Sequence, residues 1–206
     1  KITKCDLTGV TDWGRTPTLP ELAFSNCTAL QEVTLPDDMK VIGTGAFFGC
    51  AALTTVNLSQ VTWINLNAFW GCTSLETLAL DNVTAIGQEA FYGCTGLETL
   101  KIPKCTQFGN YIVSGCKALT RIEATAAGDF VDISDGRSSI ERTAVFHNRD
   151  SHYGDSAFNP AKCDLVLNAD KKQDGNATPK VFSDNEWLVM PNGQLMRWNS
   201  ITFAQQ

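Results

Sequence analysis

The sequence has no apolar run of the roughly 18 to 20 residues that a membrane-spanning helix requires. It also lacks a basic and then apolar leader at its start, because Lys1 opens directly into an alternating pattern typical of a strand. We therefore expect no membrane span in this chain, and we expect any export signal or anchor to have been removed from it.

Clustered cations are also missing. The chain carries 16 Lys and Arg against 22 Asp and Glu, which gives a formal net charge of -6. Neutralising a row of phosphates requires grouped Lys and Arg, so the composition argues against a nucleic acid partner. With 43% hydrophobic and 18% charged residues over 206 positions, the chain belongs among globular or repeat proteins.

Several chemical motifs are absent as well. The chain has eight cysteines but no C-x-x-C pair, which argues against a zinc site. It has neither a glycine-rich anion loop nor the strand-turn-helix elbow that presents a nucleophile. We expect no cofactor, no metal and no enzymatic activity.

What the sequence does have is a repeat of about 22 residues. Five cysteines recur at intervals of 23, 22, 22 and 22 residues, and a leucine follows three residues after each of them. Ala-Phe stands ahead of four of these cysteines, and Ile112-Val113 takes that place ahead of the fifth. The cysteines are Cys27, Cys50, Cys72, Cys94 and Cys116, and the leucines are Leu30, Leu53, Leu75, Leu97 and Leu119.

Each leucine begins an L-x-x-[VLI]-x-[LIA] segment, whose alternation predicts a short, half-buried strand. One unit cannot bury its own apolar side, so the units must stack with their strands in parallel. The predicted fold is a leucine-rich repeat solenoid with a parallel β-sheet, short turns or helical turns on the other side, and an irregular β-rich C-terminal cap. We assign the solenoid to residues 1–124, with an irregular first unit at 1–29.

The period is lost after Ala124, and residues 125–206 are predicted to form a degenerate repeat and a cap. "SAFNPAKCDLVL", from Ser156 to Leu167, resembles a shortened unit. "NEWLVMPNGQLMRWNSITF" has a Pro-Asn-Gly turn between two apolar runs, which predicts a hairpin.

The repeat layout, seen in "LPDDMKVIGTGAFFGC" and "DNVTAIGQEAFYGCTGLETLKIP", resembles the BspA-like leucine-rich repeat of the Treponema pallidum type. The resemblance covers about residues 20–124, and the tail has a weaker likeness to surface proteins of gut Bacteroidales. It implies a surface-exposed or secreted protein of a host-associated bacterium, and some members of the family bind matrix or other host proteins.

The cysteine column has three possible interpretations. Stacked at the strand spacing of about 5 Å, the thiols would fill volume in the core, as free cysteine commonly does. Disulfides and metal binding are the alternatives. We favour buried thiols, and we expect Cys5 and Cys105 to occupy core positions too.

Two polar clusters could hold a ligand. His147 and His152 lie with Asp150 and Asp155, and Ser151 could complete a nucleophile on paper. Oxygen ligands for calcium could come from Asp170, Asp174 and Asn176, although their spacing departs from the usual loop. We interpret both clusters as solvated loops.

Two surfaces are better candidates. The residues after Ala-Phe form an aromatic column of Phe48, Trp70 and Tyr92, flanked by Ser25 and Val113. Outward strand positions form a small, threonine-rich, nearly neutral face, which favours polar recognition. The residues predicted to line this face are Glu32, Thr34, Thr55, Asn57, Thr77, Ala79, Thr99, Lys101, Arg121 and Glu123.

We therefore expect an extracellular or cell-surface binding or adhesion module that recognises a host or matrix protein or a glycan. The alternative is a structural or assembly component of the bacterial envelope. An enzyme centred on His147, Asp150 and His152 is the third hypothesis.

Overall fold

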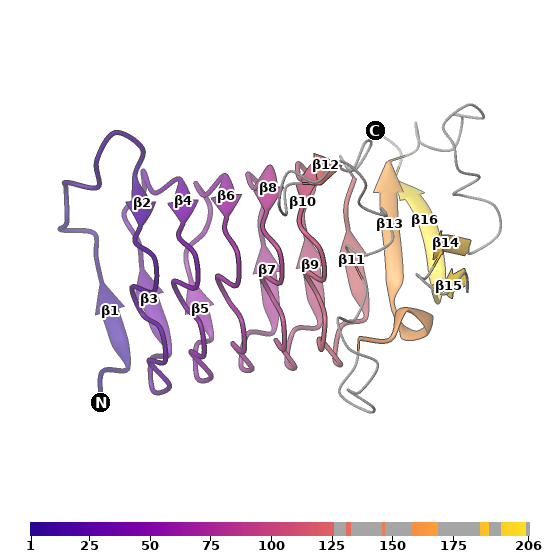
Figure 1. The fold of residues 1–206 in the computed structure, drawn as a ribbon, viewed down its shortest axis with the longest axis horizontal. Coiled ribbons are helices and arrows are strands. Elements are labelled where there is room, and N and C mark those ends of the chain that lie inside the picture. Colours follow the sequence, from indigo (N-terminus) through magenta and orange to yellow (C-terminus); the bar gives the residue numbers. More distant parts are fainter. Residues whose placement is uncertain (126–130, 133–145, 147–157, 169–185, 190–194, 205–206) are drawn as a thin grey trace.

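The computed structural model is a solenoid, and it describes residues 1–125, 131–132, 146, 158–168, 186–189 and 195–204 (Figure 1). Each coil contributes one short strand to each of two rows, and the coils stack along the long axis of Figure 1. Strand pairing between coils is parallel throughout the array, which confirms the predicted leucine-rich repeat fold.

The lower row of strands in Figure 1 carries the L-x-x-[VLI]-x-[LIA] segments. It forms two sheets, one of three strands and one of five. The first contains β1 (Lys4–Asp6), β3 (Glu32–Thr34) and β5 (Thr55–Val56). The second contains β7 (Thr77–Ala79), β9 (Thr99–Lys101), β11 (Arg121–Glu123), β13 (Asp164–Asn168) and β16 (Ser200–Ala204).

The upper row is a six-stranded sheet in which each strand has two residues. A bend or helical turn was expected here, but the backbone is extended enough to pair from coil to coil. The only helix in the described residues is the short η3 (Pro160–Lys162). The strands of the upper row are β2 (Thr18–Leu19), β4 (Val41–Ile42), β6 (Trp63–Ile64), β8 (Ala85–Ile86), β10 (Gln107–Phe108) and β12 (Val131–Asp132).

The Ala-Phe segments form tight turns between the two rows. In one coil the amides of Ala46, Phe48 and Cys50 each donate to the carbonyl three residues earlier. Neighbouring turns also bond to each other, as where Phe47 N–H donates to Ala68 C=O at 2.8 Å. The turns therefore stack as continuously as the upper strands do.

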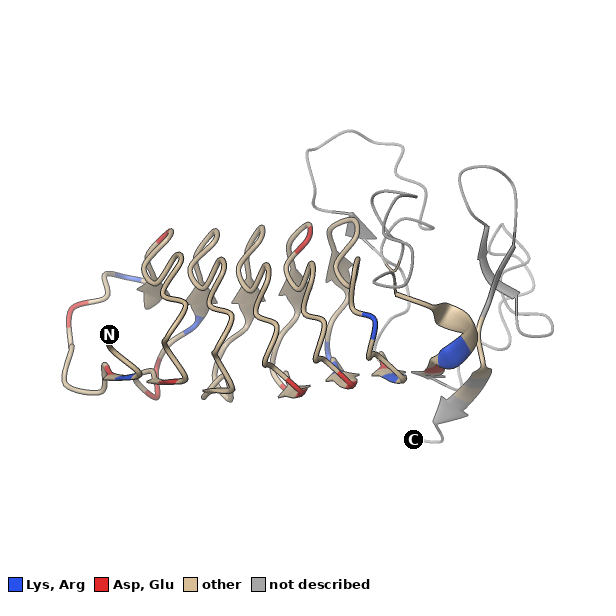
Figure 2. Cartoon of the chain, turned by 90° about the horizontal axis from the view of Figure 1, so that it is seen from below, with Lys and Arg blue, Asp and Glu red and all other residues tan. Residues whose placement is uncertain are grey.

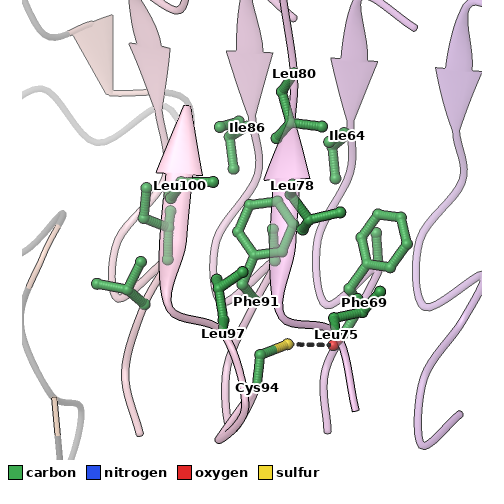
Figure 3. Packing of buried hydrophobic residues seen from close by; sticks show 14 of the residues in the cluster. Ile64, Phe69, Leu75, Leu78, Leu80, Ile86, Phe91, Cys94, Leu97 and Leu100 are labelled. Carbon is green, nitrogen blue, oxygen red and sulfur yellow. Dashed lines mark hydrogen bonds between the residues drawn. The ribbon is translucent and has the colours of Figure 1, made fainter. Parts of the chain in front are cut away.

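Apolar columns fill the interior between the two rows (Figure 3). The rings of Phe24, Phe47, Phe69 and Phe91 stack with centroid separations of 5.4, 5.1 and 5.7 Å. Because each ring contacts the ring of the next coil, the core is one continuous column.

Aromatic rings also close the array at its C-terminal end. Phe108 contacts Phe146 at a centroid distance of 6.2 Å, and Trp198 contacts both Phe146 and Phe158. The expected hairpin is confirmed, because β14 (Glu186–Val189) pairs antiparallel with β15 (Leu195–Arg197). Among the described residues, no helix has the length and hydrophobicity to cross a membrane.

Glycine at position 87 lets two coils approach closely. A Cβ atom there would lie 2.5 Å from the Leu66 amide nitrogen, which is a backbone atom that cannot swing away. We expect Gly87→Ala to lower the free energy of unfolding by about 1–3 kcal/mol in urea titrations, as overpacking does. Gly9→Ala is the control, since its Cβ would meet nothing within 4 Å. Equal stability of the two variants would contradict this steric account.

Candidate functional site

The sheet face, meaning the outward side chains of β1 to β11 in the lower row, has the geometry that the alternation predicts. In β7, β9 and β11 the central residue is buried and its two neighbours lie at least partly in solvent. Thr55, Thr77 and Thr99 fall in one column, and Thr77 pairs in register with Thr99. The hydroxyls of these three threonines have no hydrogen-bond partner within the described part of the chain.

Oppositely charged side chains pair toward the two ends of the sheet face, and the exposed carboxylates of Glu76 and Glu98 stand directly before β7 and β9, in the strand row where Figure 2 shows red segments. At one end Lys4 pairs with Glu32 at 2.5 Å. At the other, Glu123 accepts from Arg121 at 2.7 Å and lies 3.8 Å from Lys101. These pairs are solvent-exposed and contribute little to stability. Between these ion pairs, the central part of the sheet face exposes the hydroxyls of Thr55 and Thr77 to solvent.

Asn57 lies in the outward column, but its side chain is used within the protein. Its Oδ1 accepts from the Leu35 amide at 2.6 Å, and its Nδ2 donates to the Leu35 carbonyl at 3.0 Å. Asn57 therefore has less to offer a partner than the threonines beside it.

The predicted aromatic column is present and its rings stack closely. Phe48 and Trp70 have centroids 4.5 Å apart, and Trp70 and Tyr92 have centroids 5.3 Å apart, with interplanar angles of 5° and 2°. Phe48 and Trp70 are half-buried, while Tyr92 is only 6% exposed. Because the ring faces cover one another, the column presents mainly ring edges to solvent.

The residue that follows Tyr92 in this column is not Val113. The Gly93 amide donates to the Ser114 carbonyl, just as the Gly71 amide donates to the Tyr92 carbonyl, so Ser114 takes the next place. Val113 instead continues the phenylalanine column of the core and is fully buried.

The cysteine column is buried at four of its five positions, as predicted, and all eight cysteines are free thiols. The prediction is wrong for Cys27, which is exposed because no turn of the described chain packs on that side of it. Of the two further cysteines that were expected in the core, Cys105 is buried and Cys5 is half-buried against it.

The thiols also have a role that sequence reasoning missed. Each buried thiol of the column donates a hydrogen bond to the phenylalanine carbonyl of the preceding coil, as Cys94 does to Phe69 in Figure 3. The bond spans 25 or 26 residues, and a fixed spacing between phenylalanine and the next cysteine is the sequence signal that could have revealed it. The pairs are Cys50 to Phe24 at 3.0 Å, and Cys72 to Phe47, Cys94 to Phe69 and Cys116 to Phe91, each at 3.1 Å.

Burial makes the buried thiols unreactive, because it raises their pKa values. It raises the pKa of Cys50 to about 11 and the pKa values of Cys105 and Cys163 to about 12. It raises those of Cys72, Cys94 and Cys116 as well. Because the thiolate is the reactive form, the column is suited to packing and hydrogen bonding.

Thiol labelling should separate the one exposed position from the rest. We expect iodoacetamide to alkylate Cys27 first in the native protein, and to reach Cys72, Cys94 and Cys116 only after unfolding in urea. Peptide mass spectrometry measures the extent at each site. Labelling of Cys94 as fast as Cys27 under native conditions would contradict the assigned burial.

Threonines and asparagines also bond one coil to the next. The hydroxyl of Thr62 donates to Lys40 C=O and that of Thr84 to Thr62 C=O, each at 3.2 Å. Asn65 donates to Ile42 C=O at 3.1 Å. Threonine recurs at positions 62 and 84, one repeat apart, and this recurrence was a signal for the role that sequence reasoning did not use.

The other polar candidates lie outside the described residues. These are His147, Asp150, Ser151, His152 and Asp155 in one segment, and Asp170, Asp174 and Asn176 in another. Within the described residues, no three His, Cys, Asp or Glu side chains come together in a way that could hold a metal ion. The sheet face and the aromatic column are therefore the surfaces on which function can be argued.

Two solved structures with a related fold are similar to this chain. The leucine-rich repeat protein of T. pallidum is 24% identical, with a TM-score of 0.50, over 57% of this chain and 62% of that one. The pneumococcal vaccine antigen PcpA is 16% identical, with a TM-score of 0.57, over 100% of this chain and 42% of that one. This chain thus spans less than two thirds of either protein, and likeness at these identities shows the fold alone.

No curated protein matches the chain. The profile of the BspA type leucine rich repeat region, however, matches six copies over residues 3–123, more than half of the sequence. Together with the parallel coils and the recurring Ala-Phe turn and cysteine, this match shows that the chain belongs to the family of BspA-type leucine-rich repeat proteins.

Proposed function

We propose that this chain is a non-catalytic binding module, secreted or displayed on a bacterial surface, that recognises a host or matrix protein or a glycan through its sheet face. The surface location rests on the family, whose resemblance implies exposure to the host. The binding role rests on the chemistry of the sheet face.

The observation that carries the proposal is the column of Thr55, Thr77 and Thr99. Their hydroxyls lie on successive coils and bond to no described residue, whereas Thr54, Thr62, Thr84 and Thr120 use theirs to hold the preceding coil. A hydroxyl can both donate and accept. The column therefore offers a row of adaptable polar contacts along an extended ligand.

The charge pattern argues against a polyanionic ligand. The cations of the sheet face are already paired with Glu32 and Glu123, and the carboxylates of Glu76 and Glu98, exposed beside Thr77 and Thr99, have no ion-pair partner among the described residues. Such a face has little electrostatic attraction for a polyanion, so affinity would come from hydrogen bonds and close fit. Neutral glycans and polar protein segments meet that description.

The test is a binding screen of the full chain against a glycan array and a panel of matrix proteins. For each ligand found, Thr77→Arg should weaken binding roughly tenfold or more, because a bulky cation then occupies the centre of the face. Thr28→Arg is the matched control, since Thr28 is exposed on a turn away from the sheet face. It should leave binding unchanged.

Trp70→Ala tests the competing surface. Loss of binding in a folded Trp70→Ala variant, with Thr77→Arg unaffected, would move the site to the aromatic column. Binding that neither variant alters, or a screen with no ligand at all, would contradict the proposal.

A further inference from the structure

The lower row of strands is interrupted between β5 and β7. Thr55 N–H donates to Gln31 C=O, Thr99 N–H to Glu76 C=O and Arg121 N–H to Glu98 C=O. The corresponding bond from Thr77 to Thr54, both described residues, is absent, and neither residue has another partner for these groups. The break separates the three-stranded from the five-stranded sheet.

Asn57 lies at the break and departs from the bonding pattern of the other coils. In other coils the amide after the strand donates to a main-chain carbonyl of the next coil, as Leu80 does to Lys101 at 3.0 Å and Ile102 does to Glu123 at 2.8 Å. Leu35 instead donates to the side-chain oxygen of Asn57. The main chain of Asn57 leaves the ladder, and β5 ends at Val56, one residue shorter than its neighbours.

The exposed fractions of the inward-facing side chains also differ at the break between β5 and β7. Leu58 and Leu78, which face inward on the two sides of the break, are each 4% exposed, and Val56 is only partly buried. Their equivalents in the following coils, Leu100 and Ile102, are 0% exposed. Solvent therefore reaches the edge of the core at this break.

Everywhere else, the same two coils remain bonded. In the upper row β6 pairs with β4 on one side and with β8 on the other. In the turns, Gly49 N–H donates to Trp70 C=O at 2.7 Å, and the Cys72 thiol donates to Phe47 C=O. The two coils are thus joined along two edges. Along the third, no hydrogen bond joins β5 to β7, and side-chain bonds connect the coils only at its ends, from Thr73 to Ala51 C=O and from Asn82 to Ser59 C=O.

We infer that the break between β5 and β7 is a hinge in the sheet face, set by Asn57. The coils that end with β5 rotate against those that begin with β7 about the continuous upper strands and turns. The rotation changes the curvature of the sheet face, because the edge between β5 and β7 opens and closes while the other two edges keep their hydrogen bonds. This inference does not depend on the proposed binding function.

Residual dipolar couplings of the full chain in a weakly aligning medium test the hinge. We expect residues 30–58 and 77–124 to require separate alignment tensors of different magnitude. Amide exchange should show Thr77 and Leu58 exchanging roughly 100-fold faster than Thr99 and Leu80, their equivalents one coil further on. A single tensor that fits both segments would overturn the hinge, even if exchange at Thr77 were fast.

Asn57→Thr tests the assigned cause. Threonine favours strands and cannot reproduce the paired contacts to Leu35, so the main chain should rejoin the ladder, the two tensors should converge and the Thr77 amide should become protected. Asn65→Thr is the matched control, because Asn65 also bonds to the preceding coil but lies where the upper sheet is continuous. It should leave the difference between the tensors unchanged. Unchanged tensors in a folded Asn57→Thr variant would overturn the role given to Asn57.

Discussion

Replacing Phe69 with alanine should lower the free energy of unfolding by about 3–5 kcal/mol, the range for truncating a large buried aromatic residue. Phe69 is fully buried and stacks on Phe47 at 5.1 Å and on Phe91 at 5.7 Å. The turn around it is held by backbone bonds to both neighbouring coils, so the cavity cannot collapse easily. Urea titration followed by circular dichroism measures the loss.

Phe24→Ala is the control for Phe69→Ala. Phe24 is in the same column, but it is only partly buried, and among the described rings it stacks on that of Phe47 alone. Its truncation should cost clearly less. A midpoint for Phe69→Ala within error of the unsubstituted protein would show that this column does not support the core.

Raising the pH above about 8.5 should destabilise the fold steeply, because at that pH the thiols of an unfolded chain are already about half ionised. Burial raises the pKa of Cys50 to about 11 and that of Cys105 to about 12 in the folded protein. Above pH 8.5 the unfolded state therefore loses protons that the native state keeps, and stability must fall as pH rises. The fall continues up to the raised pKa of each thiol.

The expected size follows from the number of such thiols. Each thiol that stays protonated in the native state contributes a slope that approaches about 1.4 kcal/mol per pH unit once that thiol is ionised in the unfolded chain. Six cysteines have raised pKa values, so their combined slope amounts to several kcal/mol per pH unit, comparable to the whole stability of a typical domain. Urea midpoints measured under reducing conditions at steps from about pH 7.5 to about pH 10.5 cover this window.

A double variant, Cys94→Ala with Cys116→Ala, separates thiols from other groups that titrate at high pH. Both cysteines are fully buried. Removing them lowers stability at every pH. It should also make the slope of the unfolding free energy against alkaline pH shallower, by about the contribution of two thiols. An unchanged slope would assign the alkaline transition to other residues.

Much of the fold follows from periodicity in the sequence. Spacings of 22 residues in cysteine, leucine and Ala-Phe predict stacked parallel coils, and the inward columns and the C-terminal hairpin are where the pattern places them. These features depend on which side of a strand is apolar, and a sequence records that directly.

Other features depend on interactions that the apolar pattern does not record. The upper row forms strands because two residues per coil suffice once a neighbouring coil pairs with them, as Val41 and Ile42 do with Trp63 and Ile64. Asn57 has the spacing of an outward residue. Only the hydrogen bond from the Leu35 amide to its side-chain oxygen shows that this side chain bonds to the preceding coil. The stacking of Phe48, Trp70 and Tyr92 likewise determines that ring edges face the solvent.

The bond from each thiol to the phenylalanine carbonyl of the coil before it makes the coils interchangeable. Deleting residues 73–94 would remove one coil, and Cys116 would then follow Phe69 by the same 25 residues that now separate it from Phe91. The new neighbours would meet with donor and acceptor already matched. Such a protein can gain or lose whole coils through recombination, because the contacts between the coils that become neighbours are the same as before.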